Sequence, residues 1–126
     1  MIRALDVIWI RDETIRPPGP KMVVCVEPSL GLFFRINTAP KWQHAVALAR
    51  TPHHEFLKWD SYLECGEPLE LDEYVVDESL RDRGVIGTID RALVREIVAA
   101  IQKARTISPA DKERLKAALG VDTDRT

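Results

Sequence analysis

Cations and aromatic side chains gather near the ends of expected strands in the first half of the chain. The cations are Lys21, Arg35, Lys41 and Lys58, and the tryptophans nearest to them in sequence are Trp42 and Trp59. Such a set can hold single-stranded nucleic acid, because the cations contact phosphates and the bases stack on the rings. The other interpretation, which we favour for the two tryptophans, is that both anchor the core or a subunit interface.

The spacing of residues gives little indication of a metal site or of a nucleophilic catalytic residue. The chain has three histidines, His44, His53 and His54, but no HExxH motif and no paired-cysteine spacing. We therefore expect no metal site. The chain also has no P-loop and no GxGxxG motif, and we expect no cofactor. Cys25 and Cys65 are expected to be buried, reduced thiols within strands, where they could be neighbours across a sheet.

Length and composition predict one small domain. The chain has 126 residues, of which 45% are apolar and 30% charged, an ordinary globular composition. We assign residues 1–120 to a single domain and residues 121–126 to a frayed tail. No apolar run approaches the ~18 residues of a membrane span, so no membrane partner is expected. Asp6 interrupts the N-terminal apolar run, so we expect no secretory signal and a cytoplasmic location.

Negative charge is concentrated in one segment, residues 64–84. This segment holds eight acidic residues and two arginines, a balance of −6, whereas the formal net charge of the whole chain is −2. The plainest interpretation is a solvated loop or an exposed face. The alternatives are a repeller of nucleic acid and a docking site for a basic partner.

The stretch 21–38 predicts a β-hairpin. Two apolar runs, Met22–Val26 and Leu32–Ile36, flank a turn at 28–31,. The second run ends in Asn37 and Thr38, a small polar pair of the kind that small barrels present at their rim. Further strands are expected at Ala4–Ile10, Val46–Leu48, Asp60–Cys65 and Leu69–Leu71, with a stiff loop at Arg16–Pro20 and a turn or 3₁₀ piece at Pro52–Leu57.

The last third of the chain changes to helical spacing. Asp90 is expected to cap a helix over Arg91–Ala104, whose apolar residues recur every three to four positions,. Ser108 and Pro109 are expected to start a second helix, which Gly120 ends. About six short strands followed by two helices predict a mainly β, α+β fold, a small antiparallel barrel with C-terminal helices packed on it.

The order of these features resembles the MazF/PemK toxin family over residues 4–104. The similarity lies in the strand ALDVIWI, the strand opening Lys21–Val24, the strand end Arg35–Thr38, the segment Leu57–Pro68 and the helix opening Gly87–Asp90. The resemblance implies an SH3-like barrel with helices, a homodimer, and metal-independent cleavage of single-stranded RNA through attack by the 2′-hydroxyl. It also implies an antitoxin partner whose tail occupies the RNA groove.

The resemblance also assigns site residues. The family's catalytic arginine corresponds to Lys21 and its strand-end threonine to Thr38, so these two are the expected catalytic residues. The residues expected to bind nucleic acid are Arg35, Asn37, Lys41 and Lys58. The sequence departs from the family at Glu64, where a basic residue is usual, and at Gly66 and Leu69. Glu64 is expected to put negative charge near an incoming phosphate.

Three functions remain open. The first is a toxin–antitoxin-related protein that binds single-stranded RNA and acts as an endoribonuclease, with Lys21 and Thr38 on one concave surface. The second is a catalytically degenerate barrel that serves as a protein-interaction or regulatory module, suggested by Glu64 and the acidic segment 64–84. The third is an unrelated enzyme or small-ligand binder. A homodimer is expected because the tryptophans, the Phe33–Phe34 pair and the two helices offer ample apolar surface,.

Overall fold

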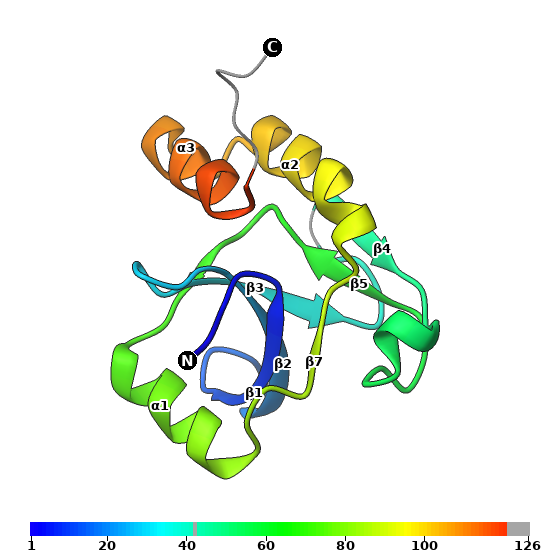
Figure 1. Cartoon of the computed structure of the whole chain (residues 1–126), viewed down its shortest axis with the longest axis vertical. Helices are drawn as coiled ribbons and strands as arrows, with labels where there is room; N and C mark the ends of the chain where they lie inside the picture. Colours follow the sequence, from blue (N-terminus) through cyan, green and yellow to red (C-terminus); the bar gives the residue numbers. More distant parts are fainter. Residues whose placement is uncertain (42, 121–126) are drawn as a thin grey trace.

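An antiparallel sheet curls into a half-barrel, and three helices pack on it (Figure 1). The computed structural model describes residues 1–41 and 43–120, so Trp42 and the predicted tail at 121–126 lie outside the described residues. The strands are β1 (Asp6–Asp12), β2 (Gly19–Glu27), β3 (Leu32–Asn37), β4 (Ala45–Leu48), β5 (Ser61–Glu64), β6 (Leu69–Glu70) and β7 (Gly87–Thr88). The sheet runs in the order β4-β5-β3-β2-β1-β7, and β6 pairs with β3. The predicted mainly β barrel with C-terminal helices is therefore confirmed.

The described helices are α1 (Glu73–Asp82), α2 (Val94–Lys103) and α3 (Pro109–Ala118), with short 3₁₀ turns η1 (Pro52–His54) and η2 (Arg91–Leu93). The helix predicted over Arg91–Ala104 is therefore a 3₁₀ turn followed by the shorter helix α2. Asp90 Oδ1 accepts a hydrogen bond from an N–H of η2, which leads into α2, and Ser108 Oγ accepts one from the first turn of α3. Gly120, with φ of +79°, follows α3,. No helix in the described part of the chain has the length and apolar character needed to cross a bilayer.

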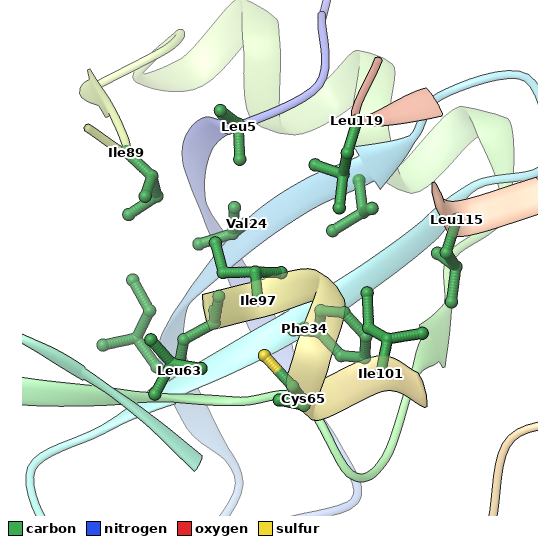
Figure 2. Close-up of a cluster of buried hydrophobic side chains, with 14 of the residues drawn as sticks. Leu5, Val24, Phe34, Leu63, Cys65, Ile89, Ile97, Ile101, Leu115 and Leu119 are labelled. Atoms are coloured by element: carbon green, nitrogen blue, oxygen red, sulfur yellow. The ribbon is translucent and has the colours of Figure 1, made fainter. Parts of the chain in front are cut away.

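Both faces of the β2–β3 hairpin are buried, because successive side chains point to opposite faces of a strand. One face contributes Val24, Val26, Phe34 and Ile36 to a large core, which residues of α2 and α3 complete (Figure 2). The other face contributes Val23, Cys25 and Phe33 to a smaller core that α1 covers. The helices accordingly sit apart, with α2 and α3 at one end of the molecule and α1 at the other (Figure 1).

The acidic segment 64–84 contains a helix that the sequence analysis did not predict. Four acids of α1 are exposed, as expected for a solvated face: Glu73, Asp77, Glu78 and Asp82. Val76 and Ser79 are buried against the sheet, where the Ser79 hydroxyl donates to the backbone carbonyl of Trp9. Val76, Ser79 and Leu80 have helical spacing, which was the available signal.

Two local predictions are wrong. The first strand is Asp6–Asp12 rather than Ala4–Ile10, because Leu5 adopts a φ of +76° that no strand can contain,. Cys25 and Cys65 are free and buried, as predicted. They are not neighbours, however, because they belong to the two different cores.

His54 connects the η1 turn to the start of the C-terminal helices. Its ring is 3% exposed. Its Nδ1 lies 2.9 Å from the backbone oxygen of Ala49, and the backbone N–H of Asp90 donates to its Nε2 at 3.0 Å. Because a carbonyl only accepts and an amide N–H only donates, the ring proton must be on Nδ1. This histidine, considered above as a metal ligand, therefore has a structural role.

We expect His54→Ala to lower the free energy of unfolding by about 2–3 kcal/mol, because it leaves a cavity and two backbone groups without their partner. Urea denaturation followed by circular dichroism measures this change. His53→Ala is the matched control, since the neighbouring His53 side chain is exposed, and its effect should stay within about 0.5 kcal/mol,. Equal losses in the two variants would contradict the structural role.

The hairpin turn gives a second stability prediction. Gly31 has a φ of +66°, and a Cβ there would stand 2.4 Å from the backbone oxygen of Leu71. Gly31→Ala should therefore cost about 2 kcal/mol or more. Gly19→Ala is its control, because a Cβ at Gly19 meets nothing within 4 Å. The melting temperatures of both variants test this prediction, and an unchanged melting temperature for Gly31→Ala would refute it.

Candidate functional site

A groove of about 410 Å³ opens at the rim of the half-barrel, where β2 begins and β3 ends. Its polar lining is Lys21, Asn37, Thr38, Lys41, Lys58 and Ser61. Its apolar lining is Trp9, Pro20, Met22, Ile36, Ala39, Phe56 and Trp59. We call this surface the rim groove. None of its described lining residues is acidic.

Five of the six predicted site residues line the rim groove: Lys21, Asn37, Thr38, Lys41 and Lys58. The hairpin register accounts for the pairing of the first two. Val23 lies opposite Arg35, so the same register, continued by two residues on each strand, brings Lys21 beside Asn37. Arg35 is the predicted residue that the structure places elsewhere.

Arg35 forms an ion pair outside the groove. Its Nε donates to Asp12 Oδ2 at 2.7 Å, and its Nη2 donates to the Thr14 hydroxyl at 2.8 Å. Asp12 is 3% exposed, and its other carboxylate oxygen accepts from the backbone N–H and the hydroxyl of Thr14. Burial by itself would raise the pKa of Asp12, but the hydrogen bonds from Arg35 and Thr14 outweigh it and hold the pKa below its usual value,.

A buried carboxylate is linked to two residues of the rim groove. Lys21 Nζ donates to Asn37 Oδ1, and Asn37 Nδ2 donates to Glu64 Oε2 at 2.5 Å. The backbone N–H of Lys41 donates to the same Glu64 oxygen at 2.8 Å. Glu64 is 2% exposed and is not a lining residue. The Glu64 carboxylate is therefore buried and bonded to two donors of groove residues, and the expectation that its negative charge lies near an incoming phosphate stays a prediction.

Lys21 holds its proton less tightly than an ordinary lysine. Burial lowers its pKa, and the positive charges of Lys41 and Arg35 lower it further,. The carboxylates of Asp12 and Glu64 oppose this change in part.

Aromatic rings form much of the apolar wall. Trp59 is 59% exposed at the rim groove, so it does not anchor the core, and its place in a subunit interface stays a prediction. Phe56 packs directly on Gly87 of β7, where a Cβ would stand 2.2 Å from the ring. The sequence does not reveal Phe56, Trp9 or Ser61 as groove residues. Their positions depend on strand pairing and on the close packing of Phe56 against Gly87. Neither can be predicted from the spacing of residues along the chain.

Other kinds of chemistry gain no support from the described residues. Burial raises the pKa of the Cys25 thiol to about 12 and also raises the pKa of Cys65, so neither thiol is a nucleophile near neutral pH. In residues 1–41 and 43–120, no group of three or more His, Cys, Asp or Glu side chains could hold a metal ion. The rim groove therefore offers ammonium groups, hydroxyls, an amide and aromatic rings.

The Asp12–Arg35 pair predicts a pH-dependent loss of stability. Asp12→Asn should lower the free energy of unfolding by about 2 kcal/mol near neutral pH. Because the folded-state pKa of Asp12 is lowered, its stabilisation is present above the usual aspartate pKa and disappears as the pH falls through the folded-state value,. The difference between wild type and Asp12→Asn should therefore shrink below about pH 4.

Urea titrations at several pH values test this expectation. Glu13→Gln is the control, because the Arg11–Glu13 pair is two-thirds exposed on both sides, at 66% and 67%, and such pairs contribute little. A difference between wild type and Asp12→Asn that stays constant from pH 7 to pH 3 would contradict the role of the Asp12 charge.

Comparisons with known proteins do not identify the family of this chain. No family model, curated protein or solved structure matches it. The resemblance to the MazF/PemK toxins therefore stays an expectation from the sequence, and the function has to be inferred from the rim groove.

Proposed function

We propose that the chain binds single-stranded RNA in the rim groove. The observation that carries the proposal is the charge of the lining: Lys21, Lys41 and Lys58 meet at one concavity, and no described lining residue is acidic. The whole chain has a formal net charge of −2, so this local excess of cations is opposite in sign to the rest of the molecule. Clustered lysines attract phosphates and make binding dependent on salt.

The aromatic lining supports a single strand over a duplex. Trp59 presents an exposed indole ring next to the lysines, and Trp9 and Phe56 supply further apolar surface. Unpaired bases stack on such rings, and each stacked base contributes about 1–3 kcal/mol. A duplex keeps its bases stacked on one another and could not use them. RNA rather than DNA follows from the toxin resemblance, and the Thr38 and Ser61 hydroxyls can hydrogen-bond a 2′-hydroxyl.

The lining supports RNA binding more directly than RNA cleavage. Attack by a 2′-hydroxyl needs one group to remove its proton and another to protonate the leaving oxygen. Lys21, with its lowered pKa, could exchange a proton, and Thr38 could only hydrogen-bond. Incubating RNA with the protein in EDTA tests the catalytic expectation, because products that end in a 2′,3′-cyclic phosphate would make Lys21 and Thr38 part of a ribonuclease site.

The alternative function, a protein-interaction module, loses one of its two supports. It was suggested by Glu64 and by the acidic segment 64–84, and Glu64 is 2% exposed, so its carboxylate is not presented to a protein partner. The exposed acids of α1 remain, but they belong to the helix that covers the smaller core, and none of them lines the rim groove. A module of this kind would bind a basic protein segment and leave RNA free, so an RNA-binding measurement separates the two functions.

We expect a fluorescently labelled, unstructured RNA to bind at low salt and to be released as the salt concentration rises. Trp59→Ala should weaken binding about tenfold or more through lost stacking. Lys58→Met should weaken it and reduce the salt dependence by about one phosphate contact. Fluorescence anisotropy over a salt series measures both effects.

The controls are residues of the same type away from the groove. Tyr74→Ala removes an aromatic ring that is 67% exposed on α1, and Lys103→Met removes an exposed lysine from α2. Neither should change the affinity for RNA. Equal losses in control and groove variants would mean that the charge of the whole surface, and not the rim groove, attracts RNA. No binding at low salt would refute the proposed function.

A further inference from the structure

We infer that Glu64 is a positioning residue of the rim groove, which holds Lys21 through Asn37 and holds the backbone at Lys41 directly. A role of Glu64 in RNA binding rests on the proposed function, whereas its effect on Lys21 can be tested without RNA. The inference reverses the role expected from the sequence, in which Glu64 repels phosphate. One buried carboxylate would instead set the geometry of two of the three groove lysines.

Three strand ends converge on this carboxylate. Lys21 belongs to β2, Asn37 is the last residue of β3, and Glu64 is the last residue of β5. The side chain of Asn37 bridges the other two, accepting from Lys21 at Oδ1 and donating to Glu64 from Nδ2. Asn37 is 5% exposed and Glu64 is 2% exposed, so water competes little for these bonds.

The charges at its two ends determine which way the Asn37 amide points. In the observed orientation its oxygen faces an ammonium group and its NH₂ faces a carboxylate. A flipped amide would turn the NH₂ toward Lys21, which only donates, and the oxygen toward Glu64, which accepts. Both bonds would be lost. Glu64 therefore keeps the Asn37 oxygen directed at Lys21, and this oxygen holds the ammonium at the groove.

The same carboxylate fixes the loop that follows β3. Glu64 Oε2 accepts from the backbone N–H of Lys41 as well as from Asn37. Its other oxygen, Oε1, is buried and has no hydrogen-bond partner among the described residues. A buried carboxylate that is only half satisfied by hydrogen bonds depends on nearby positive charge. Lys21, whose charged form the Glu64 carboxylate favours, supplies such charge, so the attraction acts in both directions.

Four charged groups act on the Lys21 ammonium. Lys41 and Arg35 make its proton easier to lose, whereas Asp12 and Glu64 make it harder to lose. Arg35 and Asp12 are paired with each other, so their effects on Lys21 largely cancel. Burial is the largest cause of the lowered pKa of Lys21, and Glu64 is the opposing carboxylate that is joined to Lys21 through Asn37.

The first experiment follows the titration of Lys21 in the free protein by NMR of isotope-labelled lysine side chains. Glu64→Gln keeps the shape and an acceptor oxygen but removes the charge. We expect the Lys21 midpoint to fall by about half a pH unit, the effect of two unit charges about 6 Å apart in a water-like medium. Glu70→Gln is the control, because Glu70 is exposed and pairs with the opposite end of β3. An unchanged midpoint in Glu64→Gln would overturn the inference.

The second experiment measures RNA affinity. A carboxylate that repels phosphate predicts tighter binding in Glu64→Gln, whereas a positioning carboxylate predicts binding that is several-fold weaker. In a Lys21→Met background the loss caused by Glu64→Gln should become smaller, because the positioned group is absent. Tighter binding, or strictly additive losses, would overturn the inference. Failure of wild-type protein to bind RNA would refute the proposed function and leave the Lys21 titration to decide the inference.

A third measurement needs no substitution and applies even if Glu64→Gln does not fold. The side-chain amide protons of Asn37 point at a buried carboxylate, so in the wild-type protein they should exchange slowly with water and their signals should shift as Lys21 titrates. Fast exchange together with no shift would show that the bridge does not exist in solution.

Discussion

Burial of the β2–β3 hairpin on both faces is the constraint on which the rest of the structure depends. Val24 and Phe34 pack into the core under α2 and α3, while Cys25 and Phe33 pack under α1. A slip of one residue would exchange these two sets of side chains and turn Lys21, Arg35 and Asn37 toward the large core,. The register is therefore strongly determined, and with it the position of every side chain at the strand ends.

The rim groove lies at the end of the hairpin where its two faces are no longer both buried. At the start of β2 and the end of β3 the alternation continues, but polar side chains take the places of apolar ones. Arg35 is neutralised by Asp12 at 2.7 Å, so it is not available to a ligand. The lysines have no acidic neighbour in the groove lining, and Glu64 reaches Lys21 only through the Asn37 amide. The ion pair and the buried carboxylate thus leave the groove itself positively charged.

Local signals were sufficient to predict the hairpin, the two C-terminal helices with the Ser108 cap of α3, and the grouping of Lys21 with Thr38. They were insufficient for α1, because this helix buries only Val76 and Ser79 and its N-cap, Asp72, makes no side-chain capping hydrogen bond. They did not show that Glu64 is only 2% exposed or that Trp59 is 59% exposed, because burial depends on which elements pack against each residue.

By itself, the sequence determined most of the strands and the two C-terminal helices, although not α1 or β7, because the spacing of apolar residues and the capping side chains act over a few neighbouring positions. It also placed a cation and a hydroxyl at adjacent strand ends. Only the tertiary structure decided which charges are neutralised and which face a ligand. That outcome depends on contacts between residues far apart in the chain, such as Asn37 with Glu64 and Arg35 with Asp12. Electrostatic energies change steeply with burial and distance, and neither quantity can be predicted from the spacing of residues along the chain.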